Sequence, residues 1–447
     1  DPTLAIAPQV AQSIYFALPK LAEKLGGFSE TVYRLPSALL LGMALFFIAR
    51  LAARLIHPRA AWFAVFACLA MHGFNYQAAD ARPYALGTAV AAASVWFLVR
   101  WLDSARWRYA LLFAASAALL LRVQLVYWPF YFLLSFYATV RLVKRETAVK
   151  TLHAAGIYAL LGLSLVPLLP GALVLLGQAQ AHVLVGLPSA LDVFHSLTPE
   201  TLVICAGGTG LLAGMLRWRL PEDRPRWRSA ALLILGWWLC QPLGLFAFSW
   251  ITGHSVFVPR YLSLSLPGAA LTATALASRY IPANRWHAMA ALLGVGVFLC
   301  MGHWNVVWPQ HDGYNWRAAA QAIDQQTSGP RTPVICISPF IEARSPAWYP
   351  GYPPDGFLYA HLQAYPIAGK PYLFPFIVTP QAEQFAATVS KNALVSSRRF
   401  FVYGMTGRVY FWREWLRNRP ELGGWTSRRI GPSGYASVVE FTAAATR

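Results

Sequence analysis

Long apolar runs separated by short polar or basic stretches fill the first two thirds of the chain. A helix needs roughly 20 mainly apolar residues to cross a hydrocarbon core of about 30 Å. Most of these runs approach or reach that length, and few charges interrupt them. We predict about ten membrane spans, over residues 35–55, 60–76, 84–101, 109–121, 125–143, 152–177, 201–216, 229–251, 261–278 and 286–308.

Two features modify this simple pattern of spans. The sixth run contains Pro167 and Pro170, which predict a kink because proline removes a helical hydrogen bond. Residues 1–33 form no span. The part from Pro8 to Leu25 is mildly amphipathic, so we expect a helix lying at the membrane interface in the first outer loop and ending at Gly26-Gly27.

The overall composition agrees with a polytopic membrane protein. The 447 residues are 57% hydrophobic and only 12% charged, whereas soluble domains carry about 25% charged residues. The net charge of +19 could suggest nucleic-acid binding. We exclude this class because the Lys and Arg residues gather at the ends of spans rather than in a basic stripe interleaved with aromatic residues.

The distribution of basic residues predicts the orientation of the spans. Alternate loops are rich in Arg and Lys, at 50–59, 100–108, 141–150, 217–228 and 279–285. Cytoplasmic loops carry such an excess, so the intervening loops at 77–83, 122–124, 178–200 and 252–260 are expected outside. An even number of spans then places both ends of the chain outside, and a cytoplasmic N-terminus would require one more helix before Asp1.

The composition becomes polar near residue 310, so we predict a transmembrane bundle over residues 34–309 and a separate domain over 310–447. In the second part, helical patterns alternate with short β-rich runs, which indicates a small extracytoplasmic α/β domain. The expected strands are 333–338, 399–404 and 436–442. The expected helices are 314–326, 381–391 and 411–419, and a Pro/Tyr-rich loop is expected over 345–376.

The outer loops hold the polar residues that could carry chemistry. Asp80-Ala-Arg82-Pro-Tyr84 places a carboxylate, a guanidinium and a phenol within five residues. The alternative is a surface ion pair, with Pro83 merely starting the next helix. Pro259-Arg260-Tyr261 could bind a phosphate through its guanidinium, or Arg260 could extend to lipid headgroups. Arg122 and Gln124 occupy a similar position with the same two interpretations.

Histidines and cysteines give no metal motif. His182, His195 and His254 lie in outer loops, but their spacings match no known ligand pattern, and each is interpreted as an ordinary loop residue. Asp192 and Glu200 are equally unspecific. Four of the five cysteines lie in apolar runs and are expected in the core. Neither a zinc site nor a disulfide framework is predicted.

Three fragments in this order resemble a known class of enzymes. They are PKLAEKLGGFSETVYRLPSALLLG, NYQAADARPYALGTA and PRYLSLSLPGAAL. With the predicted topology, they are similar to the polyprenyl-phosphate-dependent membrane glycosyltransferases of the GT-C class. These include protein O-mannosyltransferases and the lipid A aminoarabinose transferase. The resemblance covers roughly residues 5–310, and an extracytoplasmic α/β tail is also common in this class.

The resemblance implies a fold and a reaction. The fold is a mainly α-helical polytopic membrane bundle of the GT-C type with a small C-terminal α/β domain. The reaction moves a sugar from a polyprenyl phosphate to an acceptor hydroxyl of a glycan, lipid or protein, usually with inversion, at the periplasmic face of a bacterial inner membrane. Alternatives are a transporter or flippase of lipid-linked sugars and a non-catalytic assembly subunit.

The resemblance also assigns expected roles to the candidate residues. Asp80 matches an acidic residue of the second outer loop, as a catalytic residue or a ligand of Mg²⁺ or Mn²⁺. The substrate-binding set is Arg82, Tyr84, Arg122, Gln124, His254, Arg260 and Tyr261. Its arginines would neutralise the leaving phosphate, and Tyr84 and Tyr261 would line the lipid or sugar. A further acidic residue is expected roughly 25 residues before Pro8, as the outer carboxylate that precedes Asp80 in the class.

Overall fold

The computed structural model describes residues 13–177, 186–218, 228–300, 315–327, 329–338, 362, 365–375, 378, 380–431 and 434–443. The chain divides into two compact units. Pro8–Pro309 form the first, which we call the membrane unit, and Gln310–Arg447 make up nearly all of the second, the C-terminal domain. This division falls where the composition of the chain becomes polar.

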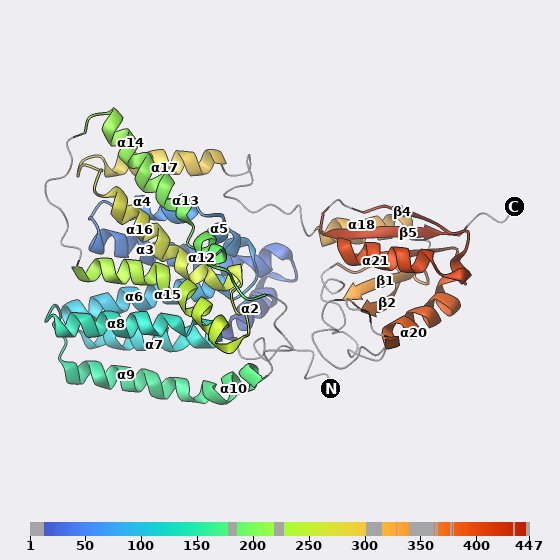
Figure 1. Ribbon diagram of the computed structural model, residues 1–447, viewed down its shortest axis with the longest axis horizontal. Coiled ribbons are helices and arrows are strands. Elements are labelled where there is room, and N and C mark those ends of the chain that lie inside the picture. The colour runs from blue at the N-terminus through green and yellow to red at the C-terminus, as the bar shows by residue number, and fades with distance from the viewer. Residues whose placement is uncertain are drawn as a thin grey trace. The chain divides into compact units, whose positions relative to one another are not determined.

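In its described residues, the membrane unit contains helices and turns but no strand (Figure 1). Its elements are η2 (Ile14–Phe16), α2 (Ala17–Gly26), α3 (Glu30–Leu55), α4 (Ala61–Leu69), α5 (His72–Ala79), α6 (Tyr84–Ser104), α7 (Trp107–Val123), η3 (Leu125–Tyr127), α8 (Pro129–Val143), α9 (Thr151–Leu165), η4 (Val166–Leu168), α10 (Leu169–Gly177), α12 (Ala190–Ser196), α13 (Pro199–Leu202), a π-helical turn (Val203–Gly207), α14 (Gly208–Met215), α15 (Arg228–Thr252), η6 (Pro259–Ser265), α16 (Leu266–Ala277) and α17 (Trp286–Cys300).

Five helical segments of the described chain are long and apolar enough to cross a membrane. They are Glu30–Leu55, Tyr84–Ser104, Leu125–Val143, Thr151–Val174 and Ser229–Thr252. Large apolar side chains on the outer surface of the bundle, such as Leu39, Leu163 and Phe298, are 66–75% exposed. In a bilayer such side chains contact lipid, so the protein is a multi-pass membrane protein.

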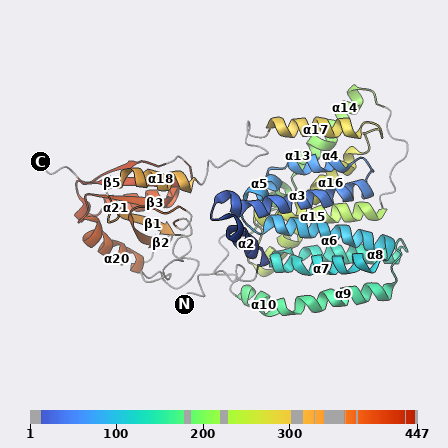
Figure 2. The same ribbon diagram turned by 180° about the vertical axis from the view of Figure 1, so that it is seen from behind.

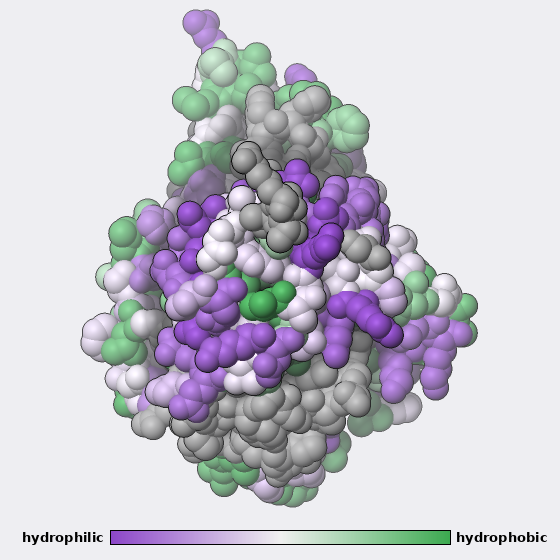
Figure 3. Space-filling view, turned by 90° about the vertical axis from the view of Figure 1, so that its right-hand side faces the viewer, coloured by the Kyte–Doolittle hydropathy of each residue, from purple (hydrophilic) through white to green (hydrophobic). Residues whose placement is uncertain are grey.

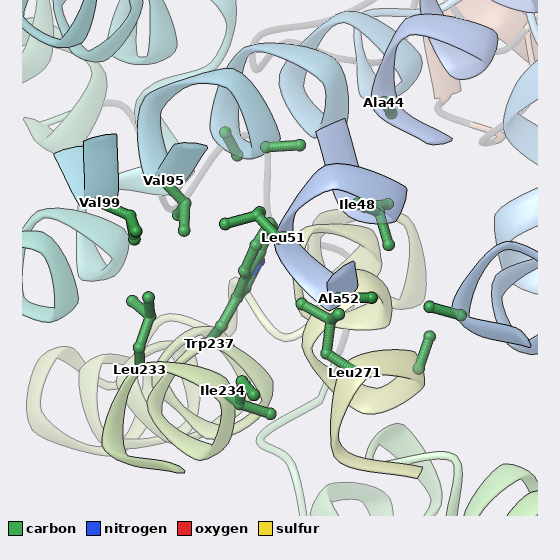
Figure 4. Close-up of a cluster of buried hydrophobic side chains, with 14 of the residues drawn as sticks. Ala44, Ile48, Leu51, Ala52, Val95, Val99, Leu233, Ile234, Trp237 and Leu271 are labelled. Atoms are coloured by element: carbon green, nitrogen blue, oxygen red, sulfur yellow. The ribbon is translucent and has the colours of Figure 1, made fainter. Parts of the chain in front are cut away.

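The centre of the bundle is formed by α3, α6, α15 and α16 (Figure 4). Trp237 of α15 is fully buried there, and its indole Nε1 donates a hydrogen bond to the Leu264 carbonyl at 2.8 Å. Leu51 of α3 and Leu271 of α16 pack in the same cluster. In Figures 1 and 2, α9 and α10 lie at one edge of this bundle and α17 at the opposite edge.

The predicted kink in the sixth run is confirmed. Helix α9 ends at Leu165, a 3₁₀ turn spans Val166–Leu168 with Pro167 inside it, and α10 continues from Leu169. The second run, expected as one helix over 60–76, is instead divided into α4 and α5 at Ala70 and Met71. Asn75 donates from its side-chain amide to the Leu69 carbonyl at 2.6 Å, which satisfies a group that the break leaves without a helical partner.

The described part of the segment before the first span contacts the bundle core. Helix α2 is amphipathic and ends at Gly26, and Gly27 has a φ of 75°. However, Tyr15 is fully buried in the bundle core. The Ser13 hydroxyl also donates to the Val123 carbonyl at 2.8 Å. Residues 13–16 therefore pack against the bundle, and the interfacial position expected for the segment 1–33 stays a prediction.

One carboxylate joins three helices at the end of the bundle that carries the basic loops. Asp103, near the end of α6, lies 2.5 Å from an Arg54 guanidinium nitrogen of α3 and 2.9 Å from Arg141 of α8. Its side chain is only 19% exposed. Some of the arginines that indicate orientation in the sequence therefore also hold the bundle together. Residues 219–227 of the predicted basic loop lie outside the described chain, as do the expected interfacial residues Trp304 and Trp308.

The C-terminal domain is a five-stranded sheet with helices on both faces. Its elements are α18 (Trp316–Gln326), β1 (Pro333–Ser338), β2 (Lys370–Pro375), α20 (Pro380–Val389), a π-helical turn (Ser390–Leu394), β3 (Arg399–Met405), α21 (Thr406–Arg417), η8 (Pro420–Leu422), β4 (Thr426–Arg429) and β5 (Ala436–Thr442). The strand order is β2-β1-β3-β5-β4. Strands β1, β2 and β3 are parallel, and β5 is antiparallel to β3 and β4.

Apolar side chains point alternately to the two faces of the sheet and form two separate hydrophobic cores in this domain. Ile335 and Ile337 of β1 face α20 and α21, where Trp412 is fully buried. Val334 and Cys336 face α18 and pack with its Ile323. Successive strand residues point to opposite faces of a sheet, so one apolar strand can serve both layers. Among the coloured residues nearest the viewer in Figure 3, hydrophilic ones surround a small hydrophobic patch.

Two strands of this sheet are absent from the sequence-based prediction. Strand β2 lies inside the segment expected as a loop over 345–376, and β4 was not predicted. Helix α21 begins at Thr406, five residues before the predicted start at Phe411. The rest of the predicted Pro/Tyr-rich loop lies largely outside the described residues.

Candidate active site at the Asp80 cavity

A cavity of about 710 Å³ lies within the membrane unit, next to Asp80. Its walls come from helix α5, the start of α6, the segment around α12, and η6 with the start of α16. The lining residues are His72, Gly73, Tyr76, Gln77, Asp80, Tyr84, Gly186, Pro188, Asp192, His195, Ser196, Thr198, Phe257, Pro259, Arg260, Leu262, Ser263 and Leu266. A few polar groups therefore converge in a largely apolar pocket, which is the usual form of a ligand site.

The backbone of Asp80 is fixed by hydrogen bonds from two directions. Asp80 follows α5 directly and has an extended conformation. Its carbonyl oxygen accepts a hydrogen bond from the Ser37 hydroxyl at 2.9 Å and another from the Arg82 amide at 2.8 Å. Ser37 is fully buried and is hydrogen-bonded to Tyr15 at 2.9 Å. Helix α3 and the segment before it therefore set the position of this carboxylate.

The Asp80 carboxylate lies among guanidinium groups but is incompletely paired. Its nearest cation is Arg82, with 3.5 Å between Nε and Oδ1, and the Arg82 side chain is 54% exposed. Burial raises the pKa of the Asp80 carboxyl, while Arg82, Arg260 and Arg34 act in the opposite direction. A carboxyl with a raised pKa beside a cavity is typical of functional sites.

Tyr84 and Arg260 complete this side of the cavity, and Tyr261 packs beside them. Tyr84, only 6% exposed, begins α6. Its ring centroid lies 6.3 Å from that of Tyr261. The Arg260 guanidinium carbon lies 5.3 Å from the Tyr261 ring centroid. The fold thus brings Arg260 and Tyr261 close to Asp80, Arg82 and Tyr84, although about 180 residues separate the two motifs in the chain.

Of the expected substrate-binding residues, Tyr84 and Arg260 line this cavity, and Arg82 and Tyr261 lie beside it, whereas Arg122, Gln124 and His254 do not line it. Arg122 donates to the carbonyl oxygens of Ala118 at 3.4 Å and Ser164 at 3.2 Å, at the ends of α7 and α9. Gln124 caps α7. His254 lies in the turn after α15, where its amide donates to the Thr252 hydroxyl. A role for these three residues in substrate binding stays a prediction.

Several residues of the cavity were missed or set aside in the sequence. His72 lies in a part of α5 that was expected to belong to the span over 60–76, and Gln77 was expected at the start of the next outer loop without a role. Gln77 is 3% exposed, and its side-chain carbonyl accepts a hydrogen bond from the Thr88 hydroxyl at 2.9 Å. His195, interpreted as an ordinary loop residue, lines the cavity. A polar, amide-containing stretch at the end of an apolar run could have indicated α5. His182 lies outside the described residues.

The second carboxylate of the cavity has a local structural role. Asp192 accepts hydrogen bonds from the backbone amide and hydroxyl of Ser189, both at 2.7 Å, and so forms a capping box at the start of α12. These bonds lower the pKa of Asp192. Asp192 thus caps α12 through its Oδ2 oxygen, whereas the Asp80 carboxylate has no comparable role in capping a helix.

The described residues do not form a donor set for a metal ion. Within this part of the chain, no group of three or more His, Cys, Asp or Glu side chains lies close enough to hold one. The neighbours of Asp80 are guanidinium groups, which are not ligands of Mg²⁺ or Mn²⁺. We therefore derive no step through a cation, and the expected metal dependence stays a prediction.

Comparison with known proteins gives a family match for part of the chain. Residues 14–170 match the sequence model of the dolichyl-phosphate-mannose-protein mannosyltransferases. This segment contains Asp80, Arg82 and Tyr84, but not Arg260. No curated protein sequence matches the chain.

Two crystal structures of ArnT from Cupriavidus metallidurans are similar to the whole fold. The apo structure is 15% identical with a TM-score of 0.53, and the match covers 95% of this chain and 86% of that one. The structure bound to undecaprenyl phosphate is 14% identical with a TM-score of 0.50, covering 97% and 88%. The predicted resemblance is thus confirmed: the chain has the fold of the GT-C membrane glycosyltransferases, a helical membrane bundle followed by a small α/β domain.

Proposed function

We propose that this protein transfers a sugar from a polyprenyl phosphate to an acceptor hydroxyl, with the Asp80 cavity as its active site. The observation that carries the proposal is the incompletely paired Asp80 carboxylate in a cavity that also holds Arg260 and Tyr84. The family match over residues 14–170 and the ArnT-like fold support the reaction class. Undecaprenyl phosphate is the molecule bound in one of the similar ArnT structures, which supports this class of carrier.

The proposed reaction requires two kinds of groups, and the cavity supplies both. As the bond between the anomeric carbon and the phosphate oxygen breaks, negative charge grows on the leaving phosphate. Arg260, with Arg82 nearby, would neutralise this charge, and a preorganised cation in a partly desolvated site stabilises such a transition state. The apolar walls at Leu262 and Leu266 suit the first isoprene units of the carrier.

Asp80 would act on the acceptor. Its carboxylate would accept the proton of the acceptor hydroxyl as that oxygen forms the new bond to the anomeric carbon. The raised pKa makes Asp80 a better base than a solvated aspartate. Attack from the face opposite the leaving phosphate would invert the anomeric centre. We propose that this site faces the periplasm across a bacterial inner membrane, because the basic loops lie at the other end of the bundle.

The first experiment tests the role of Asp80 in cells. A deletion strain is complemented with the wild type, Asp80→Asn or Asp103→Asn, and mass spectrometry records the sugars on envelope lipids and proteins. Asp80→Asn should abolish the sugar addition with normal protein levels. Asp103→Asn is the matched control, because Asp103 is also buried beside arginines but lies at the opposite end of the bundle. Full transfer by Asp80→Asn would exclude the proposed role.

The second experiment tests donor binding with undecaprenyl phosphate itself. A hydrogen bond to a charged group contributes about 1.5–3 kcal/mol, so Arg260→Ala should weaken binding to purified protein by roughly tenfold or more. Arg122→Ala is the matched comparison, because the Arg122 guanidinium is engaged with helix carbonyls away from the cavity. Equal binding by the wild type and Arg260→Ala would remove Arg260 from the phosphate site.

The expected metal dependence can be tested in the same assay. Treatment with EDTA, followed by return of Mg²⁺ or Mn²⁺, should lower and then restore transfer if a cation assists the leaving phosphate. Full activity after exhaustive chelation would show that the guanidinium groups alone perform this task.

A further inference from the structure

A basic groove in the C-terminal domain has no part in the function proposed above. Its volume is about 1060 Å³. It is lined by Gly329, Pro330, Arg331, Thr332, Pro333, Lys370, Tyr372, Thr388, Val389, Asn392, Ala393, Ser396, Ser397, Arg398 and Arg399. All of these residues belong to one compact unit, so the groove does not depend on the placement of the membrane unit.

The sheet topology explains why basic residues gather at this place. Strands β1, β2 and β3 are parallel and therefore begin at the same edge of the sheet. Lys370 pairs with Pro333 at the start of β1, and Arg399 begins β3. The close pairing requires a glycine before Lys370, because a Cβ at Gly369 would lie only 2.7 Å from the Thr332 carbonyl oxygen.

The groove carries uncompensated positive charge. Four basic residues line it and no acidic residue does. Arg399 is neutralised by the buried Glu440, with 3.0 Å between Nε and Oε1. No ion pair with a described carboxylate involves Arg331, Lys370 or Arg398, and all three are exposed. Three cations around one groove together attract an anion more strongly than any one of them would alone.

The remaining lining residues suit a sugar rather than a simple anion. The Tyr372 ring is partly exposed, and the Lys370 ammonium lies 5.4 Å from its centroid. An aromatic face can stack against the apolar face of a pyranose. Asn392 has an exposed side-chain amide, and the Thr388 and Ser397 hydroxyl oxygens, which donate to helix carbonyls, keep lone pairs for an incoming hydroxyl.

The geometry points to a binding site for a phosphate-bearing saccharide at the edge of the sheet where β1, β2 and β3 begin. Arg331, Lys370 and Arg398 bind the phosphate, and Tyr372 with Asn392 contacts the sugar ring. Arginine favours phosphate because its planar fork can donate two parallel hydrogen bonds. The site would give the C-terminal domain a recognition role separate from sugar transfer at Asp80.

The test uses the full-length protein in detergent and isothermal titration with glucose 6-phosphate. The wild type should bind it saturably. Inorganic phosphate should bind at least fivefold more weakly, and glucose should bind still less. Arg331→Glu with Arg398→Glu should weaken the binding of glucose 6-phosphate at least tenfold. Lys391→Glu is the matched control, because Lys391 is exposed and adjacent to Asn392 but does not line the groove, and it should change affinity less than twofold.

Four results would overturn the proposal. One is the absence of saturable binding of glucose 6-phosphate to the wild type. Another is an equal loss in the Lys391→Glu control, which would show a general electrostatic effect. Equal affinity for inorganic phosphate would remove the saccharide from the assignment. Binding only to phosphatidylglycerol vesicles would assign the groove to a lipid surface. If the double variant still binds undecaprenyl phosphate, it is folded. None of the four results above tests the proposed role of Asp80.

Discussion

The close approach of α15 and α16 at Gly268 predicts a linked loss of stability and activity on substitution by alanine. A Cβ at position 268 would lie 2.3 Å from the Trp238 amide nitrogen and 2.6 Å from the Trp237 carbonyl carbon. Both atoms belong to the backbone of α15, so no side chain can move aside. Ordinary contacts of a Cβ begin near 3.4 Å, and the helices must therefore separate by about 1 Å.

The separation of α15 and α16 lowers the free energy of unfolding by an amount that can be estimated from the structure. Overpacking in a well-packed core typically costs about 1–3 kcal/mol. The hydrogen bond from the Trp237 indole to the Leu264 carbonyl, now 2.8 Å, would also be stretched. This bond joins α15 to η6, which continues directly into α16, and Trp237 lies at the centre of the bundle shown in Figure 4. We expect Gly268→Ala to lower the free energy of unfolding of the membrane unit by at least about 1–3 kcal/mol.

The same movement should reach the proposed active site. Helix α16 continues directly from η6, which carries Arg260 and Tyr261. A displacement of reacting groups by about 1 Å can reduce a rate by roughly 100-fold. We therefore expect Gly268→Ala to lower sugar transfer by roughly 10- to 100-fold even in the folded fraction.

The assay compares thermal unfolding in detergent, followed by tryptophan fluorescence, with transfer activity in complemented cells. Gly162→Ala in α9 is the matched control, because no atom lies within 4 Å of its added Cβ. Glycine in a helix costs about 0.5–1 kcal/mol relative to alanine, so this control should be neutral or slightly stabilising. If Gly268→Ala and Gly162→Ala have the same unfolding temperature, the inferred contact between α15 and α16 is wrong.

Two further predictions concern the surroundings of the same site. Burial raises the pKa of Asp80 above its unfolded value, so this group favours the folded state below its unfolded pKa and loses that contribution as pH rises through its folded pKa. At pH 8, Asp80→Asn should therefore unfold at a temperature equal to or higher than that of the wild type. This difference in unfolding temperature should become smaller toward pH 4. A lower unfolding temperature of the variant at pH 8 would contradict the prediction. The buried Gln241 donates to the carbonyls of Val126 at 2.8 Å and Tyr261 at 3.2 Å. Gln241→Leu leaves both carbonyls unpaired and should cost about 1–3 kcal/mol, and an unchanged unfolding temperature would show that other donors replace the amide.

Much of the helical bundle is predictable because its driving force is local in sequence. The apolar runs at 35–55 and 229–251 correspond closely to α3 and α15. The kink around Pro167 follows from one residue type. The division of α4 from α5 was not predictable in this way. The segment 60–76 is apolar at its start, and the break between the two helices depends on a hydrogen bond from the Asn75 side-chain amide to the Leu69 carbonyl.

The C-terminal domain shows where strand prediction fails. Strands β1, β3 and β5 lie inside the sheet, and their apolar runs identify them. Strand β2 contains Pro371, which argues against a central strand, but it lies at an edge of the sheet, where proline is tolerated. Strand β4 is the other edge and reads Thr-Ser-Arg-Arg. Polar and charged residues are common at edges because they prevent further pairing, and they hide such strands from a hydrophobic pattern.

The candidate site was predictable only where its parts are contiguous. Asp80, Arg82 and Tyr84 were found because a carboxylate, a guanidinium and a phenol occur together in a short loop. Arg260 and Arg122 gave the same signal at the start or end of a span, yet only Arg260 lines the cavity. Whether such an arginine faces the cavity depends on how its helix is rotated against the neighbouring helices. The sequence alone does not give this rotation.

The degree of pairing distinguishes two aspartates that look alike in the sequence. Asp103 and Asp80 both lie near the end of a helix with arginine close by. Both carboxylate oxygens of Asp103 are engaged by arginines of other helices at 2.5–2.9 Å, and such a satisfied, partly buried carboxylate holds helices together. Asp80 has one contact at 3.5 Å, a raised pKa and a cavity beside it. Because an incompletely paired buried charge is costly, this difference supports the proposed role of Asp80 in ligand binding.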